Sequence, residues 1–335
     1  MDAKTKVALV LFVIATLVIT SCKKKEPPIV QMKVAKCTHA VGLCNLCMFI
    51  AYENQTAKED HVQIKLVNIP NWADHPAALQ SGTVDFSVTP FTNVIAAYAN
   101  GAPIKIVAGS GINGLYVLGS RDIKTASDLR GKKIGTFRCD TLEMLLYNYL
   151  KKNNMSYNDV KVVYFTDGFE LISAFSNNAV DAMTHVEPYA TQAVEKHSAN
   201  ILAIGQTVWG SDHPDCVLTA SDRIIREDPN LVKAVIAGML KAELFIEENL
   251  DKSIDKVVGI YYKAEREDIM KAANSQPPGV DIRNKKSFML ERFKDLKELN
   301  YIKRDPDPGV MDFRFLEEAI RENPQIYEKL KVKSL

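Results

Sequence analysis

The stretch AALQSGTVDFSVTP at residues 77–90 decides the fold, because a second stretch, ISAFSNNAVDAMTH at residues 172–185, has the same layout. In each, an apolar helical segment ends at Gly82 or Asn178, the residue types that most readily adopt the left-handed conformation closing a helix. Val-Asp and a short apolar run follow, and they predict a buried parallel strand that a proline-containing loop then stops. The same helix, turn and strand therefore occur in both halves of the chain.

The rest of the chain up to residue 220 alternates in the same way. The predicted strands are 32–37, 62–67, 85–88, 104–108, 133–136, 161–164, 182–184 and 201–204. The predicted helices are 45–53, 76–81, 93–100, 142–153, 169–177 and 189–196. This alternation predicts two open α/β sheets, in which ligands lie beyond the carboxyl ends of the strands. Two similar domains facing each other would place those ends on opposite walls of one cleft.

After residue 220 the chain becomes almost purely helical. Asp228 is a good N-cap and Pro229 suits the first helical position of a long apolar-faced helix. Further helices are predicted over 254–262, 265–273, 287–299 and 313–322.

The N-terminus has the pattern of an export signal. Lys4 and Lys6 precede an apolar run over 7–19, which is too short to cross roughly 30 Å of hydrocarbon comfortably. Small residues then lead to Cys22, so the segment resembles a bacterial lipoprotein signal in which Cys22 is diacylated and becomes the mature N-terminus. We expect a signal peptide over 1–21, a lipidated tether over 22–30 and a location in the cell envelope, facing the periplasm or the outside. A plain membrane-anchor helix is the alternative.

Charge and length narrow the class further. The chain has 42 Lys and Arg against 41 Asp and Glu, and this balance argues against a nucleic-acid partner, which would need a basic face. Its 335 residues suit roughly two domains after the signal is removed. The cysteines other than Cys22 are odd in number, so at least one of them cannot pair within the chain.

Four phrases together resemble one family: LQSGTVD at 79–85, NGAPIKIV at 100–107, DLRGKKIG at 128–135 and EPY at 187–189. They are similar to the solute-binding proteins of bacterial ABC importers, in the branch that handles nitrate, sulfonates, taurine, riboflavin and thiamine-pyrimidine precursors. The resemblance covers about residues 30–260.

The resemblance implies a periplasmic-binding-protein-like (type II) α/β fold, with two lobes of open mixed sheets joined by two hinge strands. Residues 31–117 and 218–335 would form lobe 1 and residues 118–217 lobe 2, with crossings near Leu115–Gly119 and Cys216–Ala220. It also implies a monomer that captures a small organic solute, needs no cofactor, catalyses no reaction and delivers its cargo to an ABC importer permease.

Cys37, His39, Cys44 and Cys47 form the most unusual cluster, where the family's first loop meets its ligand. Cys44 and Cys47 would lie on one face of a helix start. The cluster has four interpretations: a structural disulfide or apolar packing, contacts to an organic ligand, a transition-metal site, or a redox pair. As a ligand contact it enters the predicted site.

The turn over 136–141 lies between a predicted strand and a helix, and such a turn offers free backbone N–H groups to an anion. Arg138 would complete a sulfonate, phosphate or carboxylate site there, or it is an exposed surface charge. Asp140 and Thr141 lie in the same turn.

Other site candidates fall in loops expected at the cleft mouth. These are Trp72, Asp74, Thr89, Phe91, Thr92, Glu187 and Trp209. Aromatic rings can stack on a flat ligand whose N–H donors the carboxylates accept. Glu187 is equally suited to cap the helix after Pro188. Because several acids accompany a single arginine, a nitrogen heterocycle is slightly favoured over a sulfonate or nitrate-type anion.

Two other functions stay open. The first is an extracytoplasmic metal-binding protein that uses the cysteine cluster of Cys37, His39, Cys44 and Cys47. The second is a pyrimidine-synthase-like enzyme, since such synthases share this fold and use a cysteine- and histidine-rich segment. Neither a Gly-x-Ser-x-Gly elbow nor a His-Glu-x-x-His motif is present. The glycine-rich run at 109–114 is followed by a predicted strand instead of the helix that a dinucleotide site needs.

Overall fold

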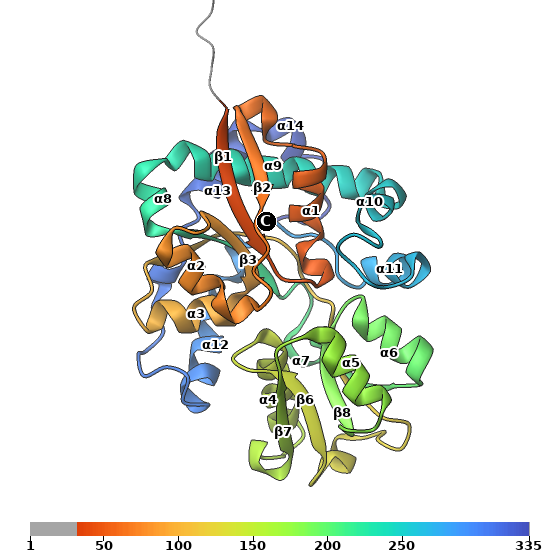
Figure 1. Ribbon diagram of the computed structural model, residues 1–335. Helices are drawn as coiled ribbons and strands as arrows, with labels where there is room; N and C mark the ends of the chain where they lie inside the picture. Colours follow the sequence, from red (N-terminus) through yellow and green to blue (C-terminus); the bar gives the residue numbers. More distant parts are fainter. Residues whose placement is uncertain (1–31, 335) are drawn as a thin grey trace, which may run out of the picture. The chain divides into compact units, whose positions relative to one another are not determined.

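A computed structural model describes residues 32–334, which hold two five-stranded sheets (Figure 1). The predicted signal peptide, the tether and Cys22 lie outside the described residues. The first sheet has the order β2-β1-β3-β10-β4, built from β1 (Lys33–His39), β2 (Val62–Leu66), β3 (Phe86–Pro90), β4 (Ile104–Gly109) and β10 (Cys216–Ser221). The second has the order β7-β6-β8-β5-β9, built from β5 (Leu115–Gly119), β6 (Lys133–Phe137), β7 (Lys161–Phe165), β8 (Ala182–Val186) and β9 (Asn200–Ile204).

The two sheets have the same topology. In each, the second strand pairs in parallel with both neighbours, β1 with β2 and β3, and β6 with β7 and β8. In each, one strand inserts antiparallel: β10 between β3 and β4, and β5 between β8 and β9. The prediction of two mixed α/β sheets is therefore confirmed. We call the part built on the first sheet lobe 1 and the part built on the second lobe 2.

The chain passes between the lobes in two short segments. The first lies over residues 110–114, ahead of β5, and the second follows β9 and ends at β10. β5 lies wholly in the second sheet and β10 wholly in the first. The lobe boundaries at 117/118 and 217/218 stay a prediction.

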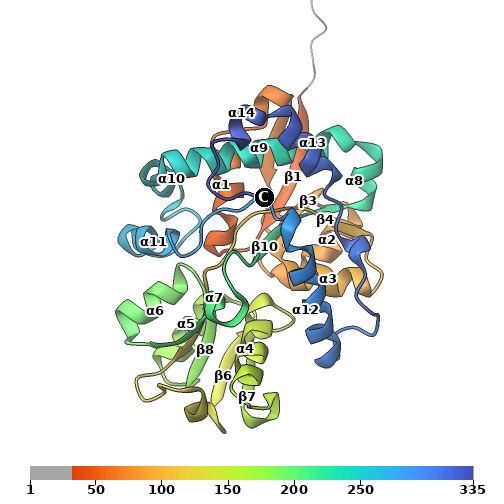
Figure 2. The same ribbon diagram turned by 180° about the vertical axis from the view of Figure 1, so that it is seen from behind.

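Helices cover both sheets (Figures 1 and 2). Up to β10 they are α1 (Leu46–Glu53), α2 (His75–Ser81), α3 (Phe91–Ala99), α4 (Thr141–Lys152), α5 (Gly168–Ser176), α6 (Tyr189–His197) and α7 (Gly205–Trp209). After β10 they are α8 (Asp222–Glu227), α9 (Pro229–Glu248), α10 (Leu250–Val257), α11 (Arg266–Ala273), α12 (Lys286–Glu298), α13 (Arg314–Glu322) and α14 (Pro324–Tyr327). Among residues 32–334 no helix is long and apolar enough to cross a membrane.

The long C-terminal helix begins as its sequence predicts. Pro229 is its first residue, and the Asp228 side chain accepts a hydrogen bond from the Leu231 N–H. The helix predicted over 254–262 was placed too late in the chain. It begins at Leu250 and ends at Val257, because Val258 is extended and Gly259 then turns the chain with φ 73°.

The repeated segments owe their similarity to one structural device. Both turns are left-handed, with φ 75° at Gly82 and φ 58° at Asn178. The carboxylate of Asp85 then accepts a hydrogen bond from the Lys36 N–H at 3.0 Å, and the backbone N–H of Asp85 donates to the Lys36 carbonyl. Asp181 holds Lys133 of β6 in the same way. Each aspartate therefore joins the start of its own strand to the strand beside it: Asp85 joins β3 to β1, and Asp181 joins β8 to β6.

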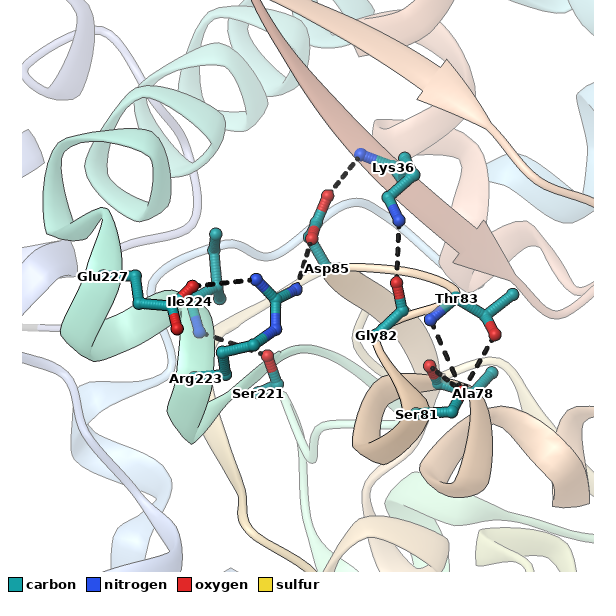
Figure 3. Close-up of polar contacts among 10 residues, drawn as sticks. All are labelled: Lys36, Ala78, Ser81, Gly82, Thr83, Asp85, Ser221, Arg223, Ile224 and Glu227. Carbon is teal, nitrogen blue, oxygen red and sulfur yellow. Dashed lines mark hydrogen bonds and ion pairs between the residues drawn. The ribbon is translucent and has the colours of Figure 1, made fainter.

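Lobe 1 adds an ion pair to this device (Figure 3). Arg223 of α8 donates to the other oxygen of the Asp85 carboxylate at 2.9 Å, and it also pairs with the exposed Glu227. Asp85 is 5 % exposed. Within residues 32–334, Asp181 has no ion-pair partner.

This difference predicts unequal effects of matched substitutions. Asp85→Ala should lower the free energy of unfolding by about 2 kcal/mol, because it leaves the part-buried Lys36 N–H without its acceptor and removes one of the two acidic partners of Arg223. Asp181→Ala removes the same backbone tie without an ion pair and should cost about 1 kcal/mol. Urea unfolding of the two variants measures both values, and equal losses would show that Arg223 contributes nothing.

Candidate functional site

A small pocket with a volume of about 40 Å³ lies between the two lobes. Lobe 1 and its crossing segment line it with Ala40, Val41, Gly42, Cys44, Trp72, Pro90, Asp215 and Cys216. Lobe 2 lines it with Phe137, Asp140, Leu142, Gly168, His185, Val186 and Tyr189. Four parallel strands, β1, β3, β6 and β8, end at or beside these residues. The pocket therefore lies at the carboxyl ends of both sheets, as the alternation predicted.

The lobes contact each other around this pocket. The Leu43 N–H donates to the Glu187 carbonyl at 2.8 Å, and Thr92 Oγ1 donates to the Cys139 carbonyl at 2.9 Å. These two hydrogen bonds join the lobes beside the pocket.

Two buried carboxyl groups line the pocket. Asp140 is 2 % exposed and Asp215 is 3 % exposed. Asp140 caps α4 by accepting from the Leu142 N–H at 2.9 Å, and it accepts from Trp72 Nε1 at 3.2 Å. Asp215 accepts from Thr141 Oγ1 at 3.0 Å and from Gln276 Nε2 at 2.9 Å.

Burial disfavours the charged form of both acids. The pKa of Asp140 is raised to about 8: burial contributes most, the Leu142 N–H opposes the shift, and the nearby Asp215 adds to it. Burial likewise raises the pKa of Asp215 to about 7, against the hydrogen bonds from Thr141 and Gln276. Near pH 7 both carboxyl groups are therefore partly protonated, and a ligand that donates hydrogen bonds to them favours their ionised form.

Aromatic rings form the rest of the wall. Trp72 lies 5.0 Å from Phe137 between ring centroids, and His185 lies 5.7 Å from Phe137 and 5.0 Å from Tyr189. Burial lowers the pKa of His185 to about 4, so its ring is neutral at pH 7. The residues that line the pocket include no lysine or arginine.

The cysteine cluster separates into two environments. Cys44 forms a disulfide with Cys216, 172 residues away, and this bond lines the pocket. Cys47 points into the core of lobe 1, where its Sγ donates to the Met239 carbonyl at 3.1 Å and burial raises the pKa of its thiol well above the usual value. Cys37 is also fully buried in that core.

The metal site predicted from Cys37, His39, Cys44 and Cys47 is therefore not formed. His39 packs its ring edge against Phe49, with centroids 4.5 Å apart. In residues 32–334, the only close group of side chains with metal-type donors is Cys44, Asp215 and Cys216, and its two sulfurs are bonded to each other. The prediction that Cys44 and Cys47 lie on one face of a helix start is wrong, because Cys44 precedes α1 and bonds to Cys216 of β10, whereas Cys47 lies in α1 and points into the core.

Glu187 lies beside the pocket and not in its lining. Its carboxylate accepts from the Thr191 N–H and from Thr191 Oγ1, both at 3.0 Å, so it caps α6. Burial raises the pKa of Glu187 to about 6. Capping was one of the two predicted roles.

Among the other predicted site residues, several lie outside the lining. Arg138 packs its guanidinium over the rings of Tyr164 and Tyr301, and Trp209 donates to Asn148 Oδ1 at 3.2 Å. Thr89 is buried at the end of β3 and Phe91 at the start of α3. Asp74 is exposed in the short helix Trp72–Asp74. Of the predicted set, Cys44, Trp72 and Asp140 line the pocket, while Thr141 touches it through Asp215 and Thr92 closes it through Cys139.

Sequence reasoning missed Asp215, Phe137, His185 and Tyr189 as site residues. Phe137 and His185 stand near the ends of predicted strands, where this fold places its ligand, so their positions were a usable signal. Asp215 directly precedes the predicted crossing at residues 216–220, and no local pattern marks it.

Two mixed sheets of equal topology, with a pocket between their strand ends, define the periplasmic-binding-protein-like class. Solved structures agree with this fold. A ligand-binding component of an ABC-type import system from Staphylococcus aureus, with zinc bound, has a TM-score of 0.75 at 18% identity, and the match covers 86% of this chain and 99% of that one. The periplasmic nitrate-binding protein of Synechocystis has a TM-score of 0.76 at 15% identity, covering 90% and 92%.

Residues 49–265 match the NMT1/THI5-like family, and the chain belongs to this family. The predicted family resemblance is thereby confirmed. A putative aliphatic sulfonates-binding protein from Bacillus subtilis is 29% identical over 208 residues, which are 61% of this chain and 61% of that protein. One from Escherichia coli is 22% identical over 217 residues, or 62% and 66%. The matches thus span less than two thirds of the length of these relatives.

Proposed function

We propose that this protein is an extracytoplasmic solute-binding protein of an ABC importer, and that its solute is a nitrogen heterocycle or another small molecule with N–H donors. The observation that carries the proposal is the pair Asp140 and Asp215, buried in an interlobe pocket whose lining includes no basic side chain. The family and the relatives named for solute binding support the general role.

The same geometry disfavours a sulfonate or nitrate, although relatives carry those names. An anion would use the free N–H groups at the start of α4, but Asp140 already accepts from the Leu142 N–H there. Arg138, the predicted partner of such an anion, lies against Tyr164 and Tyr301. The pocket lining also supplies no basic side chain to compensate the charge of an anion.

A flat ring with amino substituents suits the pocket better. Trp72 and the neutral His185 offer apolar faces for stacking, and the carboxylates accept hydrogen bonds from exocyclic amines. The pocket's volume of about 40 Å³ is smaller than such a ring, so binding requires the lobes to move apart. We infer binding without chemistry, so the pyrimidine-synthase-like alternative would require turnover of a pyridoxal-type substrate by the purified protein.

The cellular setting is part of the proposal. We propose export through residues 1–21, acylation of Cys22, a lipid-anchored monomer in the cell envelope, and delivery of the solute to a permease. Cys22→Ser should release the protein from the membrane, and a variant that stayed membrane-bound and uncleaved would overturn the anchor.

A binding panel tests the solute class. Isothermal titration of purified protein with 4-amino-5-hydroxymethyl-2-methylpyrimidine, taurine, methanesulfonate and nitrate should give saturable binding with the aminopyrimidine and none with the three others. Tight binding of taurine or nitrate would overturn the proposed class. The same panel with Zn²⁺ tests the metal-binding alternative.

Solute binding should strengthen as pH rises. A donor-rich solute favours ionised Asp140 and Asp215, whose pKa values in the pocket are about 8 and about 7, so binding near pH 7 should release protons. Affinity for the aminopyrimidine should rise severalfold from pH 6 to pH 9, as titrations in two buffers of different ionisation enthalpy would show. The groups that face this pair are Trp72, Thr141, Gln276 and Glu143.

The ligand-free protein should show the opposite trend in stability. Because the folded pKa values are raised above the usual 3.8, the folded state holds more protons than the unfolded state between about pH 4 and pH 8. The stabilisation from these groups is complete below pH 4 and is lost as pH rises through 7 and 8.

A further inference from the structure

A third buried carboxylate, Glu143, lies one turn into α4 and outside the lining of the solute pocket. It has no exposed surface. Its oxygens accept from the Cys139 N–H at 2.6 Å, Tyr157 Oη at 2.9 Å and Tyr164 Oη at 2.6 Å, all within lobe 2. They also accept from Tyr301 Oη at 2.8 Å.

Tyr301 comes from the other lobe. It follows α12 and packs against the core of lobe 1. The guanidinium of Arg138 lies 5.7 Å from the centroid of its ring and 5.9 Å from that of Tyr164, so a positive charge lies over both phenol rings. Next to this cluster, Lys151 of α4 pairs at 2.9 Å with Glu298 at the end of α12. The phenol of Tyr301 therefore makes a part-buried hydrogen bond to a carboxyl group across the lobe boundary.

The loop before α4 connects this cluster to the pocket. Cys139 donates its N–H to Glu143 and accepts Thr92 Oγ1 of lobe 1 at its carbonyl. The next residue is Asp140, whose carboxylate lines the pocket. The contacts of Glu143 thus set the loop that presents Asp140 to the solute.

We propose that Glu143 and Tyr301 are positioning residues: their bond holds the lobes closed and fixes the loop that carries Asp140. The inference deepens the proposed function, since it concerns how the same pocket closes. Loss of the Tyr301 hydroxyl opens the lobes more often, so the solute both enters and leaves faster.

Tyr301→Phe and Tyr164→Phe form a matched pair for the test. Each removes one phenol hydroxyl from Glu143, but only Tyr301→Phe removes a bond between lobes. The first readout needs no solute: amide hydrogen exchange of Leu43, whose N–H donates across the pocket to Glu187. Tyr301→Phe should speed this exchange on the order of tenfold, which corresponds to about 1.4 kcal/mol, and Tyr164→Phe should leave it within a factor of two.

If the Leu43 exchange rate were unchanged in Tyr301→Phe, or raised equally by both variants, the Tyr301–Glu143 bond would not hold the lobes closed. An amide in the centre of β1 should exchange at the same rate in all three proteins, which detects general destabilisation. With the aminopyrimidine as probe, stopped-flow measurements of Tyr301→Phe should show association and dissociation rates that both rise about tenfold, and rates equal to those of the wild type would also contradict the proposal. If the aminopyrimidine does not bind at all, the proposed solute class fails, while the exchange result still tests whether the Tyr301–Glu143 bond holds the lobes closed.

Discussion

Asp140→Asn should weaken binding of the aminopyrimidine roughly 100-fold, which corresponds to about 2–3 kcal/mol. The substitution keeps the shape of the side chain and an oxygen that can cap α4, because Asn is as good an N-cap as Asp. It removes the negative charge that favours an N–H-rich solute in a buried site. Isothermal titration at pH 8.5 measures the loss where the wild-type carboxylate is mostly ionised.

The folded protein should tolerate this change. Asp140 is buried without a basic partner, and its raised pKa reflects the cost of its charge, so the variant should unfold within a few degrees of wild type. Asp167→Asn is the matched control, since Asp167 also caps a helix, α5, but is exposed and outside the pocket lining. It should leave affinity unchanged. Equal losses in both variants would mean that capping and not charge explains the effect. Full affinity in Asp140→Asn would remove the main support for the solute class.

Loss of the Cys44–Cys216 disulfide should be the largest change in stability. The two cysteines are 172 residues apart, so the bond restricts a long loop of the unfolded chain. Cys44→Ser with Cys216→Ser should lower the free energy of unfolding by about 3–5 kcal/mol and the melting temperature on the order of 10 °C.

A reductant provides the internal control for this prediction. Dithiothreitol should lower the stability of the wild-type protein to nearly that of the double variant and should not affect the double variant itself. Wild-type stability that is insensitive to reductant under unfolding conditions would show that the bond does not stabilise the fold. Solute affinity near the melting point would fall for the same reason, while affinity at 10 °C tests whether the disulfide also shapes the pocket wall.

The sequence by itself determined the α/β class, the repeat and the family. These features depend on local signals: the left-handed turns at Gly82 and Asn178, the apolar strand runs, and the N-cap at Asp228. The repeated Val-Asp could be recognised because each aspartate performs the same task, tying its strand to the one beside it. The location of the pocket followed as well, since strand direction alone sets the edge at which a parallel sheet binds ligands.

Only the tertiary structure decided which side chains meet in the pocket. Local spacing showed that Cys44 and Cys47 are close in the chain, but packing turns Cys47 into the core of lobe 1 and brings Cys44 to Cys216. Asp215 lines the same pocket as Asp140, and Arg138 packs over the ring of Tyr301 instead of contacting a ligand. These pairs join residues 75 or more positions apart and come from different lobes or elements. The physical reason is that sequence periodicity indicates which face of an element is buried, whereas the partner on that face depends on how whole sheets and helices pack together.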